Sequence, residues 1–149
     1  MTRSSGSPAF ASRLEDTRLE IVRRRFQSEI VAAARDTGRT VRVTPYVLAE
    51  PGDERRADLE LIDAYVRSLG WQLAATSFAD VGQAPVIGQR PGFTQACMYA
   101  AQGFAHGIVA ISRAAITTDN DTYALVLEQL HHRSVFLSYL PGETGPEPT

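Results

Sequence analysis

Apolar residues recur every three or four positions near the start of the chain. Between residues 14 and 34 they fall on one face of a helix: Leu19, Val22, Phe26, Ile30 and Ala33. This spacing predicts an amphipathic helix. Gly38 suits the end of that helix, because glycine readily takes the left-handed conformation of a C-terminal cap. We therefore expect one helical segment over residues 14–38.

Beyond Gly38 the pattern changes to strands that alternate with helices. Runs rich in strand-forming residues predict strands over 40–48, 71–78, 107–111 and 134–140. Apolar stripes at helical spacing predict helices over 59–69, 93–102 and 123–132. Pro45, inside the first strand, should mark a bulge or a position without a ladder donor. The alternation predicts a three-layer α/β fold with a mainly parallel, four- to five-stranded sheet, preceded by an extra N-terminal helix.

The composition is that of one compact domain with polar ends. The chain has 149 residues, of which 44% are hydrophobic. Its first residues are rich in Ser, Gly and Ala, and its last ones alternate Pro, Gly and Glu. We expect a flexible N-terminus over 1–13, the amphipathic helix over 14–38, the α/β domain over 39–140 and a flexible tail over 141–149.

Charge and special residues narrow the function classes. A formal net charge of -2 argues against nucleic-acid binding through bulk charge, although local patches remain possible. No apolar stretch approaches the roughly 20 residues that span a bilayer, so we expect a cytoplasmic protein without membrane contact. The single cysteine, Cys97, has no disulfide partner within the chain. Neighbouring helical residues such as His131 and His132 point about 100° apart, so neither a metal nor a cofactor is expected.

Polar residues follow three of the predicted strands. In an open parallel sheet, ligands bind where the carboxyl ends of the strands lead into loops. Those ends here are residues 48–53, 79–82 and 112–116. Candidate chemistry is therefore expected at these three segments.

Four motifs around these strand ends carry a family resemblance. They are Asp80-Val81-Gly82, Arg90-Pro91-Gly92-Phe93, the strand end from Gly107 to Arg113, and the closing strand from Arg133 to Leu137. In this order they resemble the catalytic domain of resolvase and invertase-type serine recombinases, over about residues 41–140. The resemblance implies a flavodoxin-like fold. It also implies a serine, at the end of the first strand, that attacks a DNA phosphodiester without metal, while arginines stabilise the added negative charge.

The chain keeps part of the family's site and departs from the rest. Asp80, Arg90 and Arg113 match the family's loop aspartate and two of its arginines, so Arg90 and Arg113 are candidates for binding an anion or phosphate. Four positions depart from the pattern: Leu48 and Ile116 replace arginines, Ser112 replaces an acidic residue, and Glu50 (or Ala49, if the alignment slips by one) replaces the nucleophile. Leu48 and Ile116 cannot hold a phosphate, and Glu50 would repel one. We expect a degenerate domain that does not cut DNA by itself.

The retained residues also admit purely structural roles. Asp80 with Gly82 can form a simple turn, in which the aspartate accepts backbone hydrogen bonds. Arg90 can be an exposed residue ahead of Pro91, which is favoured at the first position of a helix. Arg113 can pair with Asp80 or Glu50 as an internal salt bridge.

The N-terminal helix has no counterpart in the family pattern. It either packs on its own domain or serves as an interface for self-association or a partner, through Leu19, Val22, Phe26 and Ile30. Its arginines could touch DNA, but nearby acidic residues dilute their field. Only nine residues follow Leu140, so neither the family's long dimerisation helix nor its helix-turn-helix is expected within this sequence.

Three function hypotheses follow. The first is a catalytically inactive recombinase-like protein that acts as an interaction or regulatory module, as a homo-oligomer or with a protein partner. The second is a DNA-associated accessory or subunit of a recombination system. The third is an anion or small-ligand binder that uses Asp80, Arg90 and Arg113.

Overall fold

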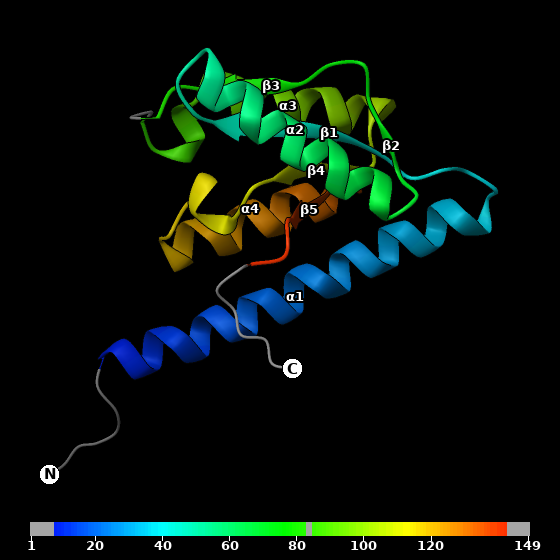
Figure 1. Ribbon diagram of the computed structural model, residues 1–149. Coiled ribbons are helices and arrows are strands. Elements are labelled where there is room, and N and C mark those ends of the chain that lie inside the picture. The colour runs from blue at the N-terminus through cyan, green and yellow to red at the C-terminus, as the bar shows by residue number, and fades with distance from the viewer. Residues whose placement is uncertain (1–7, 83–84, 143–149) are drawn as a thin grey trace, which may run out of the picture.

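The computed structural model describes residues 8–82 and 85–142 and shows helices packed around one sheet (Figure 1). Its helices and strands are α1 (Pro8–Asp36), β1 (Arg42–Leu48), α2 (Asp53–Ser68), β2 (Gln72–Leu73), β3 (Phe78–Asp80), α3 (Pro91–Tyr99), β4 (Gly107–Ala110), α4 (Asn120–His132) and β5 (Phe136–Tyr139). Three short helical turns complete the order, namely η1 (Ile87–Gln89), η2 (Ala100–Phe104) and η3 (Arg113–Ala115). Within the described residues, no helix is long and apolar enough to cross a membrane.

The sheet has the order β2-β1-β4-β5, and β3 pairs with β1 beyond the end of β2. Each of its strand pairs is parallel. Side chains of successive strand residues point to opposite faces, so the sheet has two apolar sides. One side, which includes Val43, Val109 and Phe136, packs under α2. The other, which includes Ile108 and Leu137, packs against α3 and α4. The predicted three-layer α/β fold with a mainly parallel sheet is confirmed.

Pro45 lies in the middle of the sheet without breaking β1. The backbone groups of Val41 and Val43 face the neighbouring edge, where their carbonyls accept from Gln72 and Ala74. Pro45, two residues further on, directs its missing N–H to the same side. The neighbouring strand is interrupted at that point, between β2 and β3. The proline therefore occupies a position that needs no ladder donor, and the strand predicted over 71–78 is two short strands instead.

Helix α1 lies along the β5 edge of the sheet and contacts both apolar sides. Val22 and Phe26 pack with the α3/α4 side, whereas Ile30 and Val31 pack with the α2 side. Figure 1 shows the helix running past β5 and α4. The Nη1 atom of Arg23 donates a hydrogen bond of 2.7 Å to the carbonyl of Leu137 in β5. Because an edge strand exposes unpaired backbone groups, α1 protects this edge.

The ends of α1 differ from the prediction in one respect. The helix already begins at Pro8, so residues 8–13 are helical and not part of a flexible segment. Residues 1–7 and 143–149, which were also predicted to be flexible, lie outside the described residues. Proline is well suited to the first turn of a helix, because the N–H that it lacks would have no partner there.

Ser134 takes a backbone conformation that glycine takes elsewhere in the chain. It follows α4 with a φ of 62°, while Gly70 follows α2 with a φ of 75°. The two helix ends share a hydrogen-bond pattern, since the amide of Val135 bonds the carbonyl of Leu130 as the amide of Trp71 bonds that of Val66.

Replacing Ser134 with glycine is therefore expected to stabilise the domain by about 0.5–1 kcal/mol, because a side chain is strained in the left-handed region. Urea unfolding would measure the change. Ser68→Gly, at the exposed last residue of α2, is the control and should lower stability, because its backbone is helical. A loss of stability in Ser134→Gly would contradict the expectation.

Candidate functional site

Two of the three predicted strand ends lie next to each other at one end of the sheet. Leu48 at the end of β1 is opposite Asp80 at the end of β3. The amide of Ala49 continues the pairing with a 3.0 Å hydrogen bond to the carbonyl of Asp80. The third segment follows β4 and is joined to this place by Arg90, which bonds the carbonyl of Ala115 at 2.7 Å.

Asp80 is a buried carboxylate that caps helix α3. Its Oδ1 accepts from the amide of Gly92 at 2.8 Å, and its Oδ2 accepts from the amide of Phe93 at 3.0 Å. Oδ2 also accepts from the hydroxyl of Tyr46 at 2.8 Å. The first amides of a helix have no partner within it, and a negative charge is favourable there. Asp80 therefore accepts hydrogen bonds from the start of α3. The alternative, in which it only stabilises a turn with Gly82, is wrong.

Arg90 is buried, with 8% of its surface exposed. Its Nε donates to the carbonyl of Pro85 at 2.8 Å, and its Nη1 donates to Ala115 and, at 3.4 Å, to the Tyr46 hydroxyl. Among the described residues, no carboxylate lies within 4.0 Å of it to form a salt bridge. The alternative of an exposed residue ahead of α3 is thus wrong. Arg90 ties two loops together through neutral oxygen atoms.

Tyr46 joins these two residues and was not predicted as a site residue. It is fully buried on β1 and lies edge-on to Phe93, with the ring centroids 5.2 Å apart. Burial raises the pKa of its hydroxyl well above the ordinary range; the hydrogen bond from Arg90 opposes the rise and Asp80 adds to it. A buried tyrosine hydroxyl needs a polar partner. A tyrosine on the first predicted strand was therefore the one sign in the sequence that Tyr46 bonds a polar side chain.

Arg113 has different partners from those predicted. Its Nη1 contacts the Asp16 carboxylate of α1 at 3.3 Å, and its Nη2 donates to Asn120 at 2.6 Å. Its guanidinium lies over the ring of Tyr123, 4.0 Å from the centroid. The expected salt bridge with Asp80 or Glu50 is absent from the described residues. Arg113 instead fastens the extra N-terminal helix to the domain.

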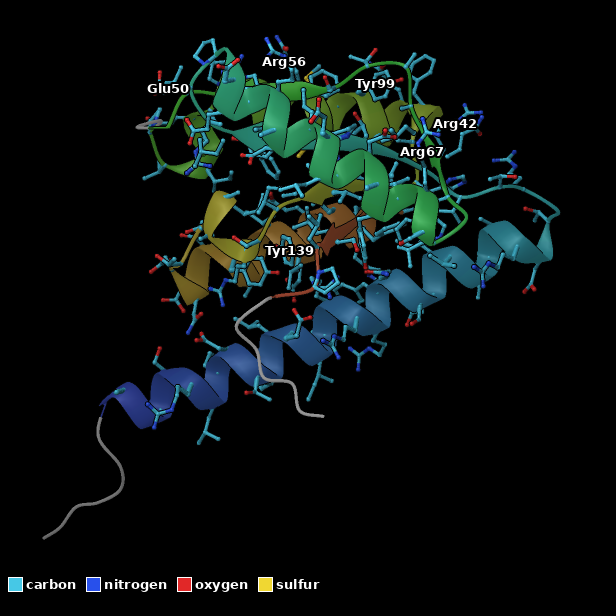
Figure 2. All side chains as sticks on the ribbon, viewed as in Figure 1. Arg42, Glu50, Arg56, Arg67, Tyr99 and Tyr139 are labelled. Atoms are coloured by element: carbon cyan, nitrogen blue, oxygen red, sulfur yellow. The ribbon has the colours of Figure 1, made fainter. Side chains whose placement is uncertain are left out.

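The departing positions have no common role. Ile116 is fully buried and Leu48 partly buried in the apolar side under α3 and α4. Ser112 is exposed, at the beginning of η3. Glu50 lies at the surface beyond β1 (Figure 2), where its Oε2 accepts from the amide of Gly82 at 3.2 Å. Glu50, which the sequence comparison predicts at the nucleophile position, is thus a carboxylate bonded to the Asp80-Val81-Gly82 loop.

The four interface candidates contact their own domain. Leu19 is buried, and Val22, Phe26 and Ile30 pack against the two apolar sides. His131 of α4 adds to this contact, because it stacks on Phe26 with ring centroids 3.7 Å apart. Of the two alternatives for this helix, the structure shows the one in which it packs on its own domain.

Metal-binding side chains do not gather in the described part of the chain. No group of three His, Cys, Asp or Glu residues there could hold a metal ion. Burial raises the pKa of Cys97 to about 12, so its thiol remains protonated at neutral pH. The Nε2 atom of His131 lies 3.0 Å from Glu29 of α1, within the helix contact.

Comparison with known proteins shows similarity at the level of the fold. No protein-family model and no curated protein matches the sequence. Among solved structures, the chain is similar to the C-terminal catalytic domain of ISC1926 TnpA, an IS607-like serine recombinase, with a TM-score of 0.59, 12% identity and coverage of 71% of each chain. It is also similar to the N-terminal catalytic domain of TP901-1 integrase, with a TM-score of 0.57 and 11% identity, over 66% of this chain and 76% of the other. The fold is that of a serine recombinase catalytic domain, as the resemblance predicts.

Proposed function

We propose that this chain is a recombinase-like domain without cleavage activity, which acts as an interaction or regulatory module within an oligomer. One observation carries the proposal. The residues that match the family's site hold the fold together: Asp80 caps α3, and Arg90 bonds Pro85 and Ala115. Their hydrogen bonds are directed to the backbone of this chain and to the Tyr46 hydroxyl.

The replaced positions support the same conclusion. In-line transfer of a phosphodiester needs a positioned nucleophile together with several free cationic groups. Here the nucleophile position holds Glu50, and two arginine positions hold Leu48 and the fully buried Ile116. A phosphate placed at this end of the sheet would meet a carboxylate and apolar side chains.

Incubation with supercoiled plasmid, followed by denaturation, tests for cleavage. We expect no nicked DNA and no covalent protein–DNA product, either from the unaltered chain or from Glu50→Ser. The second variant restores a hydroxyl at the nucleophile position but leaves the apolar replacements in place. A covalent product from the unaltered chain would overturn the proposal.

A DNA-associated accessory role is the second candidate, and the fold similarity to two DNA recombinase catalytic domains favours it. Arginines exposed on α1 would supply the phosphate contacts, but Arg18 is paired with Glu15 through two of its nitrogen atoms. A gel-shift experiment with duplex DNA at low salt distinguishes the two candidates. Retarded DNA that is released by added salt would favour the accessory role. An unshifted duplex, together with an oligomer in light scattering, would favour the interaction module.

A further inference from the structure

A polar hollow lies at the carboxyl ends of β4 and β5; Ser112 and Arg113 line it, whereas Asp80 and Arg90 do not. Its volume is about 600 Å³, and α1 forms one wall where it passes the β5 edge. Figure 2 shows Tyr139, one of its lining residues, at the end of β5. Other lining side chains come from four places: Arg24 from α1, Tyr65 from α2, Ser112 from the loop after β4 and Ser138 from β5.

Ser138 gives the hollow its most informative feature. Only 2% of its surface is exposed, and its side chain makes no hydrogen bond to any described residue. Leu137 belongs to the α3/α4 side of the sheet, so Ser138 faces the opposite side, toward α2. A buried hydroxyl without a partner costs about 1–3 kcal/mol. Such a group in a polar hollow indicates a partner from outside the chain.

Further unused donors surround this hydroxyl. The side-chain hydroxyls of Ser112 and Tyr65 also lack hydrogen bonds within the described ranges. Arg24 donates only through its Nε, to Glu20 at 2.9 Å, so the terminal nitrogens of its guanidinium have no partner there. Three hydroxyls and a guanidinium can together serve a ligand with several acceptor oxygens.

The charge of the hollow favours an anion. Among the described residues, its lining contains Arg23, Arg24 and Arg113 and one carboxylate, Glu20. Burial works to raise the pKa of Glu20, but hydrogen bonds from Arg23 and Arg24 outweigh it and lower the pKa, so the carboxylate stays ionised. Arg23, at 2.6 Å, and Arg24, at 2.9 Å, are both paired with Glu20, so these three side chains together carry one positive charge. Arg24 therefore retains attraction for a second anion.

We propose that this hollow binds the phosphoryl group of a small phosphate ester. The hydroxyls of Ser138 and Ser112 donate to the phosphate oxygens, and Arg24 supplies the positive charge. Ser138 lies too deep for a phosphodiester within duplex DNA, whose phosphorus is flanked by two sugars. We expect a terminal phosphate, which carries only one substituent, to reach it. Both the position, beyond the carboxyl ends of parallel strands, and the volume are typical of small-molecule sites.

The test titrates the full chain with inorganic phosphate and with phenyl phosphate at constant ionic strength, followed by amide NMR shifts. We expect saturable shifts at Ser112, Ser138 and Arg24, with the ester bound at least as tightly as inorganic phosphate. Arg24→Gln and Ser138→Ala should each weaken binding more than tenfold. Arg25→Gln is the matched control, because it removes the same charge from an exposed α1 residue that does not line the hollow.

The stability of Ser138→Ala separates a ligand site from a structural hydroxyl. Without phosphate, this variant should unfold at the same or a higher urea concentration than the unaltered chain, because it loses only an unpaired group. Lower stability without any phosphate effect would mean that an ordered water satisfies Ser138, and would overturn the proposal. Equal weakening by Arg24→Gln and Arg25→Gln would also overturn it. So would displacement of phosphate by a short DNA duplex without terminal phosphates. None of these outcomes tests whether the chain cleaves DNA, so a failure of this proposal is distinguishable from a failure of the proposed function.

Discussion

Replacing Gly92 with alanine is expected to destabilise the domain by about 3 kcal/mol, which is at the upper end for an overpacked position. A Cβ atom on Gly92 would lie 2.2 Å from the carbonyl oxygen of Ala79 and 2.8 Å from Oδ2 of Asp80. The first of these atoms belongs to the backbone of β3 and cannot turn away. Helix α3 would have to move off the strand, and the hydrogen bonds between its first turn and Asp80 would lengthen or break.

Urea unfolding of Gly92→Ala beside Gly88→Ala measures this effect. Gly88 lies four residues earlier in the same connection, and a Cβ there would have no atom within 4 Å. The control therefore shares the change in backbone entropy but not the clash. Equal stability of the two variants would show that α3 does not approach β3 as closely as described. The glycine of the Arg-Pro-Gly motif would then need another explanation.

Replacing Asp80 with alanine is expected to cost about 3 kcal/mol, because it leaves buried donors without an acceptor. Two of these are the amides of Gly92 and Phe93, and the third is the hydroxyl of Tyr46. Arg90 would remain buried near the vacated place, still bonded to Pro85 and Ala115. The Arg90 guanidinium reaches Asp80 through the Tyr46 hydroxyl. Without Asp80 it would lose the negative charge that compensates its own.

Asp119→Ala provides the comparison for Asp80→Ala. Asp119 caps α4 from an exposed position, where its carboxylate accepts from the amide of Thr122 at 2.8 Å. Loss of an exposed cap typically costs about 1 kcal/mol. Thermal and urea unfolding should therefore show that Asp80→Ala is much less stable than Asp119→Ala. A similar loss in both variants would contradict the view that Asp80 organises the end of the sheet.

The local parts of this fold were readable from the sequence, because residue spacing reflects secondary structure directly. The helical stripe from Leu19 to Ala33 and the alternation after Gly38 placed the elements in order. Pro45 was correctly expected to avoid a ladder bond, but its effect on the neighbouring strand depends on a pairing that the sequence does not display. The start of α1 was missed because Ser, Gly and Ala outweighed the single signal of Pro8.

The candidate site was less predictable, because its contacts join distant segments. Asp80 and Arg90 were named by motif as remnant site positions, but their partners include Tyr46, which lies 34 residues before Asp80 and was not named. Arg113 pairs with Asp16, 97 residues away, although carboxylates in the motifs themselves looked more suitable. The apolar stripe of α1 indicated which face is covered. It could not indicate whether the same chain or another copy covers it.

The position of α1 against β5 also affects how the chain is made. The helix is synthesised first, but the carbonyl that Arg23 binds belongs to Leu137, 114 residues later. Until β5 has left the ribosome, α1 lacks the edge strand that Arg23 binds. Strand β5 therefore has two roles in folding, because it adds to the sheet and also binds α1. Premature termination before β5 would leave both β4 and α1 without this partner.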